Sequence, residues 1–347
     1  MPIRLQAIRH PWLAKALSWL CLLLGIYAFG AIIYDGPFAS ASLSNTLLSL
    51  CWVTCIWFIT KRYGDKIAPQ WISLAFIAVV LIPWSFIMPS NDRDWAPEFS
   101  KTGWVEIEGD QITFHHFRNF DYGLDGAITE KWETRVVHLS KLRHIDYFHD
   151  DFGGKLMGHP MLSFDFGDEG RICLSIETRR EKDEHFTPLG GLYKMYELQY
   201  IFGSEEDIIR LRTNIRKEKV YLYRFDFTPE KNREIFLASV KTQNELHENP
   251  RFYHILRANC TTSLRNQASP KDQETLKDWR MLANGQLDAM VKEKGWIKGD
   301  SLSFKDLRKQ ALITDDAQKL HDSDEFSEAI RAGRKGFEDT YSNSPRS

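Results

Sequence analysis

The sequence predicts an α+β protein in which three N-terminal transmembrane helices precede a mixed domain of strands and helices. Three observations support this prediction. Residues 1–88 contain three long uncharged stretches. Much of residues 105–227 alternates between apolar and polar side chains, as half-buried strands do. Residues 229–246 then form a helical pattern that ends before the Asn249-Pro250 pair.

The uncharged stretches predict a membrane anchor. They cover residues 16–34, 41–60 and 68–88, and a bilayer core of about 30 Å requires about twenty helical residues. A cleaved signal peptide would have a shorter apolar core, of about 7–15 residues, and would not be followed by further stretches of this kind. Residues 1–89 are therefore interpreted as a three-helix anchor.

The charges beside these stretches predict their orientation. Basic residues precede the first stretch and follow the second, whereas residues 35–40 between them contain no Lys or Arg. Basic loops stay on the cytoplasmic side of the membrane. Three crossings would place everything after residue 89 on the other side. The predicted location is a bacterial inner membrane, as a multi-pass protein with its C-terminal domain in the periplasm.

Composition excludes several classes of protein. The net charge is only −2, which excludes a strongly basic nucleic-acid binder, and we expect no nucleic-acid partner. A chain with 27% charged and 13% aromatic residues is not wholly disordered. Five cysteines in 347 residues are too few for a disulfide scaffold.

The region after the anchor divides into three parts. Residues 90–101 are polar and are predicted to form a juxtamembrane linker. Residues 102–335 are predicted to form the periplasmic α+β domain, and residues 336–347 a disordered tail. Within the domain the pattern predicts several strands, a helix from 229 to 246, a second helix that starts near 259, and further helical structure from 272. The later predicted strands are 193–202, 208–212 and 220–227.

The most regular strands are predicted at residues 158–166 and 171–180. Alternate residues in each are apolar, so the two would form a hairpin with one apolar and one polar face. Pairing Phe166 with Ile172 matches the apolar faces and leaves a five-residue loop. The polar face then carries six side chains: His159, Ser163, Cys173, Ser175, Glu177 and Arg179.

Cys260 is the candidate nucleophile. Cys21, Cys51 and Cys55 lie inside the uncharged stretches, which leaves Cys173 and Cys260. Cys260 stands in the sequence ILRANCTTSLR at the expected start of a helix, where free N–H groups would stabilise a thiolate and an oxyanion. Two other interpretations remain open: a buried structural cysteine, or a disulfide between Cys173 and Cys260.

His159 is the candidate base for this thiol. In the predicted register it lies opposite Arg179 and diagonal to Glu177, and the Glu177 carboxylate would fix the tautomer of the imidazole. A solvent-exposed histidine beside a surface glutamate is the alternative. The His- and Asp-rich residues 144–151 match no metal-site spacing and are more typical of a solvated loop. Because motifs for nucleotides are also missing from the sequence, we expect no metal and no cofactor.

Several segments together resemble a known family. HPMLSFDFGDEG, LSIETRRE and RANCTT are similar to the Lnb N-terminal periplasmic domain family, which is associated with lipoprotein N-acyltransferases. The resemblance covers roughly residues 90–335 and is most specific at His159, residues 177–180 and residues 259–262. The order of a strand histidine followed by a helix cysteine also resembles circularly permuted papain-like folds.

The resemblance implies a cysteine-dependent acyltransferase. His159, oriented by Glu177, would deprotonate Cys260, and the thiolate would take an acyl chain from a phospholipid and pass it to the N-terminus of a lipoprotein. The implied partners are phospholipid, the lipoprotein N-terminus and the inner membrane. Arg179 and Arg180 would bind a phosphate headgroup. The full set of expected substrate-binding residues is Arg179, Arg180, Ser163, Asn259 and Thr261.

Two other functions remain open. A papain-like peptidase or amidase, or a lipid hydrolase of the cell envelope, would use the same Cys260 and His159 with water as the acceptor. A non-catalytic envelope binding module would use the polar face of the hairpin, and Cys260 would then be structural.

Overall fold

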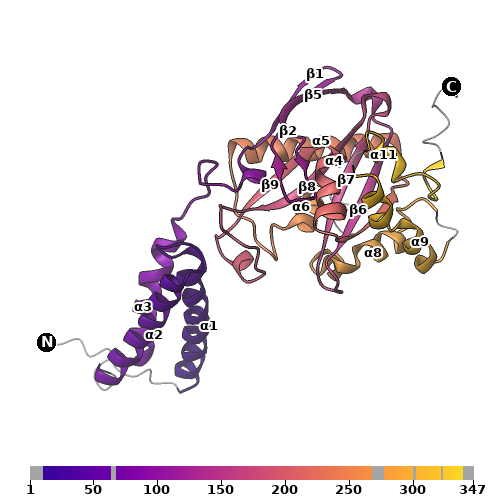
Figure 1. Ribbon diagram of the computed structural model, residues 1–347. Coiled ribbons are helices and arrows are strands. Elements are labelled where there is room, and N and C mark those ends of the chain that lie inside the picture. The colour runs from indigo at the N-terminus through magenta and orange to yellow at the C-terminus, as the bar shows by residue number, and fades with distance from the viewer. Residues whose placement is uncertain (1–10, 64–67, 268–276, 300–301, 322, 339–347) are drawn as a thin grey trace, which may run out of the picture. The chain divides into compact units, whose positions relative to one another are not determined.

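The computed structural model describes all of the chain except residues 1–10, 64–67, 268–276, 300–301, 322 and 339–347 (Figure 1). The chain forms two compact units, which we call the helical unit and the sheet unit. The helical unit comprises Met1–Ser90, Asp183–Glu197 and Phe252–His254. The sheet unit comprises Asn91–Lys182, Leu198–Arg251 and Ile255–Ser347.

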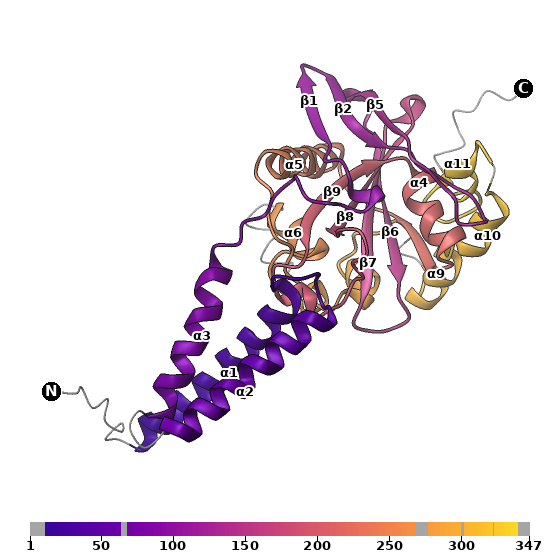
Figure 2. The ribbon, with the colours of Figure 1, turned by 60° about the vertical axis from the view of Figure 1, so that its left-hand side comes forward.

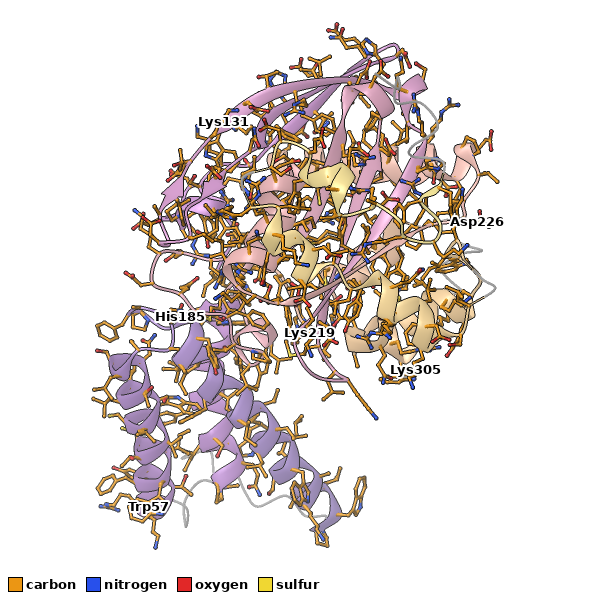
Figure 3. All side chains as sticks on the ribbon, turned by 45° about the vertical axis from the view of Figure 1, so that its right-hand side comes forward. Trp57, Lys131, His185, Lys219, Asp226 and Lys305 are labelled. Atoms are coloured by element: carbon orange, nitrogen blue, oxygen red, sulfur yellow. The ribbon has the colours of Figure 1, made fainter. Side chains whose placement is uncertain are left out.

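The helical unit contains three apolar helices that lie side by side (Figures 1 and 2). They are α1 (Pro11–Asp35), α2 (Leu43–Tyr63) and α3 (Pro69–Ser85). Many of their large apolar side chains are exposed, as expected of groups that face lipid; Trp57 of α2, labelled in Figure 3, is 60% exposed.

The prediction of three spanning helices is wrong by the criterion of length. Of the described helices, α1 and α2, with 25 and 21 residues, are long and apolar enough to be candidate spans. Helix α3 has only 17 residues. It begins at Pro69 and ends two residues after Pro83, where the Phe86 amide donates to the carbonyl oxygens of Pro83 and Trp84.

A segment distant in sequence packs on these helices within the helical unit. The Lys194 ammonium donates to the carbonyl oxygens of Trp84, Ser85 and Ile87 at 2.8–3.0 Å, at the C-terminal end of α3. A cation satisfies the carbonyls that a helix end leaves without partners. The sequence predicts a strand from residue 193, but the observed strand begins only at Glu197. Lys194 therefore lies outside the strand.

The sheet unit is built on an eight-stranded sheet with the order β1-β2-β9-β8-β7-β6-β10, and β5 also pairs with β2. The pairs among β6, β7, β8 and β10 are antiparallel, and β2 and β9 are parallel. A separate ladder joins β3 (Asp121–Tyr122) and β4 (Ile128–Thr129). The strands of the main sheet are β1 (Trp104–Glu108), β2 (Gln111–Arg118), β5 (Trp132–His138), β6 (His144–Asp151), β7 (Gly158–Asp165), β8 (Arg171–Arg179), β9 (Glu197–Gly203) and β10 (Lys219–Arg224).

Helices cover both faces of this sheet (Figure 2). On the first face, Phe148 and Met161 of the strands form an apolar core with Ile208 and Ile330. On the second face, Phe236 of α5 packs against Phe164 with ring centroids 5.1 Å apart. The helices are α4 (Glu205–Arg210), α5 (Pro229–Glu248), α6 (Cys260–Gln267), α8 (Leu287–Glu293), α9 (Phe304–Ala311), α10 (Thr314–Lys319) and α11 (Phe326–Ala329). Short helical turns are η1 (Pro97–Phe99), η2 (Leu139–Lys141), η3 (Gly167–Glu169), η4 (Gly190–Leu192), η5 (Leu211–Ile215), η6 (Trp279–Met281) and η7 (Asn284–Gln286).

The mixed α+β class is thus confirmed, and two predicted elements need correction. Residues 208–212, predicted as a strand, belong to α4 and η5. Ser204 caps α4 by accepting a hydrogen bond from the Asp207 amide, and acidic residues fill the first turn. Residues 144–151, predicted as a solvated loop, form strand β6, the second strand from one edge of the sheet, and most of its side chains are buried.

The predicted limits of the domain also shift. Trp95 and Phe99, in the segment predicted as a linker, are buried in the core of the sheet unit. Phe337, in the segment predicted as a disordered tail, is buried in the same core. The rest of that predicted tail, residues 339–347, lies outside the described residues. The folded unit therefore extends beyond 102–335 at both ends.

Candidate functional site

The hairpin of β7 and β8 forms as predicted, but its loop begins one residue earlier. Asp165 pairs with Arg171, so the five-residue loop is 166–170. Gly167 and Gly170 both adopt positive φ, which favours glycine, and the Phe166 amide donates to the Gly170 carbonyl at 2.9 Å to close the loop. Extending the observed register places His159 opposite Glu177 instead of opposite Arg179.

His159 and Glu177 meet in a buried polar cluster. His159 Nε2 lies 2.8 Å from the Ser175 hydroxyl and 3.5 Å from Glu177 Oε1. The Ser175 hydroxyl donates to Glu177 Oε1 at 2.5 Å. His159 is only 8% exposed, which excludes the solvent-exposed histidine. Because Nε2 faces Ser175 and Glu177, the other ring nitrogen, Nδ1, is the one left to act as a base.

Arg212 supplies the positive charge of this cluster. Its guanidinium lies 2.6 Å from Glu177 Oε1 and 3.3 Å from Asp150 Oδ2. Burial raises the pKa of Asp150 to about 8, so Glu177 is the carboxylate that balances Arg212 at neutral pH. Burial alone would raise the pKa of Glu177, but Arg212 and His159 hold it well below its ordinary value. Burial lowers the pKa of His159, against the opposing effect of Glu177, and the imidazole is neutral at pH 7.

Cys260 is the first residue of α6, as the sequence predicts. Asn259 caps the helix: its side-chain oxygen accepts from the Thr262 amide at 2.8 Å and from the Thr261 hydroxyl at 3.0 Å. All five cysteines are free, so Cys173 and Cys260 form no disulfide. The cap thus fixes the start of α6 and leaves the first amides of the helix directed at the thiol.

Cys260 rests as a thiol. Burial raises its pKa to about 12, while hydrogen bonds from the Thr261 and Cys260 amides act in the opposite direction. The amides therefore lower the pKa as the sequence predicts, but burial outweighs them. A thiol with this pKa becomes a nucleophile only when a base removes its proton during the reaction.

Asn284 connects Cys260 to the start of β7. Its side-chain amide donates to Cys260 Sγ at 3.4 Å, and its side-chain oxygen accepts from the Gly158 amide at 2.9 Å. Gly158 immediately precedes His159. A Cβ added at Gly158 would meet the Asp150 carbonyl and the His149 ring at 2.9 Å, so this close approach requires glycine.

Cys260 and His159 are not joined by a hydrogen bond anywhere in the described part of the chain. His159 shares the first face of the sheet with Ser175, whereas Pro160 and Leu162 project from the second face. Cys260 and the Glu177 carboxylate are nevertheless close enough that this carboxylate raises the pKa of the thiol.

A second buried histidine lies on the second face. His149 Nδ1 is 2.9 Å from the Tyr147 hydroxyl, and Nε2 is 4.0 Å from Asp288 Oδ1. Burial raises the pKa of Tyr147 well above its ordinary value, and the nearby Cys260 acts in the same direction. Burial also lowers the pKa of His149. This histidine is the natural comparison for His159 in any test of which base serves the thiol.

An apolar cavity of about 350 Å³ adjoins the start of α6. Thr261, next to Cys260, forms part of its wall, and α5, α6, α8 and the second face of the sheet contribute the other lining residues of this half-open cavity. Its apolar wall includes Tyr147, Leu162, Phe225, Leu264, Met290 and Trp296. A cavity of this size and composition suits an apolar ligand.

The other residues expected to bind substrate have partners inside the protein. The Arg179 guanidinium stacks on Trp95 at 4.1 Å and donates to the Phe99 carbonyl at 3.0 Å. The Arg180 guanidinium lies 5.3 Å from the Phe99 ring centre and pairs with Glu98 at 3.7 Å. These packed positions favour a structural role for both arginines.

Ser163 and the predicted loop 144–151 belong to a buried ion-pair network. The Ser163 hydroxyl donates to Glu205, and Arg331 pairs with Glu205 at 2.6 Å and with Asp146 at 2.8 Å. Burial alone would raise the pKa of Asp146, but Arg331 and Arg224 hold it at about 2. Among the described residues, no group of three or more His, Cys, Asp and Glu side chains is placed to hold a metal ion.

Sequence reasoning placed Ser175 on the polar face of the hairpin without giving it a role, and it missed Asn284 and Arg212 as members of the site. Arg212 was assigned to a strand, although the pattern of Ser204 followed by Asp207 marks the start of a helix that would have placed it. Asn284 comes 24 residues after Cys260, and the signal there is the Asn284-Gly285 pair, which marks a turn.

Comparison with known proteins gives one match. Residues 128–285 match the model of the Lnb N-terminal periplasmic domain family, and this range contains His159, Glu177, Cys260 and Asn284. It is narrower than the resemblance expected over 90–335. No curated protein and no solved structure matches the chain.

The match accords with the rest of the structure. A family of periplasmic domains, together with two apolar N-terminal helices, is compatible with a membrane-anchored protein that has a periplasmic domain. In its segment 128–285, this chain is similar to the Lnb N-terminal periplasmic domain family.

Proposed function

We propose that the protein is a membrane-anchored periplasmic thiol acyltransferase. It takes an acyl chain from a phospholipid as a thioester on Cys260 and transfers the chain to the N-terminal amine of a lipoprotein. The observation that carries the proposal is the position of Cys260 at the start of α6, next in sequence to Thr261, which lines an apolar cavity of about 350 Å³. The helix start supports the chemistry, and the cavity supports an acyl chain as the group that is transferred.

In the first half-reaction, Cys260 attacks the ester carbonyl of the phospholipid. His159 Nδ1 takes the thiol proton, and Glu177 with Ser175 holds the ring through Nε2. The Cys260 and Thr261 amides and the Asn284 side chain are the donors nearest the oxyanion that forms. The carbon–oxygen ester bond then breaks, and the leaving alcohol of the lysophospholipid takes the proton from the imidazolium.

In the second half-reaction, the lipoprotein amine attacks the thioester. Its nitrogen loses a proton to His159, the carbon–sulfur bond breaks, and Cys260 leaves as a thiolate that recovers the proton from the imidazolium. Two features support this sequence of steps: the imidazole is neutral at pH 7, as a base must be, and a buried site limits access of water to the thioester.

The second candidate function is hydrolysis by the same residues, with water in place of the amine. A papain-like peptidase is less favoured because the cavity wall is mostly apolar, and a peptide requires hydrogen-bonding partners along its backbone. A lipid hydrolase would fit the cavity equally well. The acceptor therefore separates the two remaining candidates.

We expect an amine to be preferred over water as acceptor. Full-length protein in detergent is incubated with deuterated dipalmitoylphosphatidylglycerol and a synthetic diacylglyceryl-cysteine peptide, and the products are measured by mass spectrometry. The expected product is the peptide with one added deuterated acyl chain. The same peptide with an acetylated N-terminus serves as control and gains none. Release of free deuterated fatty acid at the same rate with or without the peptide would identify a hydrolase instead.

A further inference from the structure

One cation in the wall of the apolar cavity has no partner in the described part of the chain. Arg265 of α6 lines the cavity and is partly buried, and its guanidinium makes neither an ion pair nor a hydrogen bond there. Lys231, which also lines the cavity, pairs with Glu234 at 3.1 Å. Among its described lining residues, the cavity therefore combines an apolar wall with a single positive charge that is not balanced locally.

We propose that this cavity is the binding site of the acyl donor, a glycerophospholipid whose acyl chain fills the cavity and whose phosphate binds the guanidinium of Arg265. The inference rests on the proposed function and adds to it the headgroup chemistry of the donor and the residue that recognises it.

The spacing along α6 fits such a ligand. Arg265 follows Cys260 by five residues, which is about 7.5 Å along a helix axis at about 1.5 Å per residue. In a glycerophospholipid, the glycerol backbone separates the ester carbonyl from the phosphate. Five residues also turn a helix by about 140°, so it is the long side chain of Arg265, lining the cavity with Thr261 and Leu264, that brings the guanidinium to the phosphate. The thiol at the start of the same helix meets the ester.

The charge balance favours a phosphate over a neutral ligand. A guanidinium beside an apolar wall loses part of its hydration, and an anion within reach restores the lost interaction. The forked N–H groups of arginine bind two phosphate oxygens at once. Arg179 and Arg180, which the sequence suggested for this role, instead stack on Trp95 and Phe99.

The test is photo-cross-linking with lipids that carry a diazirine at the end of one acyl chain. Full-length Cys260→Ala protein in detergent is irradiated with the phosphatidylglycerol analogue or with the matching diacylglycerol analogue, which lacks the phosphate. Labelled peptides are mapped by mass spectrometry. Only labelled peptides from α8, Leu287–Glu293, are counted, because α8 contributes to the cavity and does not belong to the helical unit.

We expect the phosphatidylglycerol analogue to label α8. In Arg265→Gln, its labelling should fall about tenfold, the loss expected for one charge-assisted contact, while labelling by the diacylglycerol analogue stays unchanged. Arg257→Gln is the matched control, because Arg257 lies on the same segment but is exposed. Val291→Trp, which fills the cavity, should abolish labelling by both analogues.

Two outcomes would overturn the proposal. One is no labelling of α8 in the unsubstituted Arg265 protein. The other is an equal change for both analogues in Arg265→Gln, which would indicate a structural role. Competition by millimolar inorganic phosphate identifies the source of the anion. If phosphate suppresses labelling by the phosphatidylglycerol analogue but not by the diacylglycerol analogue, the result supports phosphate recognition. If phosphate binds but the phosphatidylglycerol analogue labels α8 no better than the diacylglycerol analogue, the result contradicts a lipid headgroup site. Because Cys260 is absent, labelling is independent of whether the thioester forms.

Discussion

Replacing His159 with alanine is expected to slow acylation of Cys260 by about 10²–10⁴-fold, the usual contribution of a positioned general base. The thiol has a pKa of about 12 and cannot react at pH 7 without proton removal. The measurement is the burst of p-nitrophenol from a short-chain p-nitrophenyl ester, which reports the first half-reaction in the full-length protein.

His149→Ala is the matched comparison, because both histidines are buried and lie on neighbouring strands. We expect His149→Ala to lose much less of the acylation rate than His159→Ala. Added imidazole should restore part of the burst in His159→Ala. The reverse order, with His149→Ala the slower variant, would assign the base to the second face of the sheet. In the wild type, the rate should fall with acidification only below the ordinary histidine pKa of about 6.5, because burial lowers the pKa of His159.

Glu177→Gln is expected to destabilise the sheet unit by about 3–5 kcal/mol at pH 7, the usual effect of removing one partner of a buried ion pair. Arg212 would then lie buried beside Asp150, which is largely protonated because its pKa is about 8. The measurement is pulse proteolysis of the full-length protein across a urea series in detergent.

The effect of pH on this difference in stability follows from the direction in which the pKa of Glu177 is shifted. The pKa of Glu177 in the folded protein lies well below its ordinary value, so its stabilising effect is complete above about pH 4.5 and is lost as the pH falls toward the folded pKa. The gap between wild type and Glu177→Gln should therefore narrow in acid. Glu169→Gln, which removes the partner of the partly exposed His138, should cost at most about 1 kcal/mol. An equal cost for both substitutions would contradict a special role for the Glu177–Arg212 pair.

The strand hairpin and the start of α6 were predictable because their signals are local. Alternation of apolar residues placed His159 and Glu177 on the same face of neighbouring strands, and a polar residue before Cys260 marked the helix cap. The register differed because two glycines at positive φ close the loop at 166–170, one residue before the loop chosen from apolar matching alone. That shift moved His159 from Arg179 to Glu177.

The parts that escaped prediction depend on distant contacts. Asn284 reaches Cys260 only because the chain returns to the start of β7 after α6. Asp146 of strand β6 is buried because Arg331 and Arg224 neutralise its charge in the core. Such pairing overrides the usual exposure of charged residues, and periodicity cannot reveal it.

The central claim is that Cys260 carries the acyl chain as a thioester. The most direct test is the intact mass of the detergent-purified protein after incubation with phospholipid, before and after neutral hydroxylamine, for wild type and Cys260→Ala. The account predicts an adduct with the mass of one acyl chain in the wild type, its removal by hydroxylamine, and no adduct in Cys260→Ala. An unmodified wild-type mass from protein that is folded by pulse proteolysis, or an adduct that persists in Cys260→Ala, would contradict it.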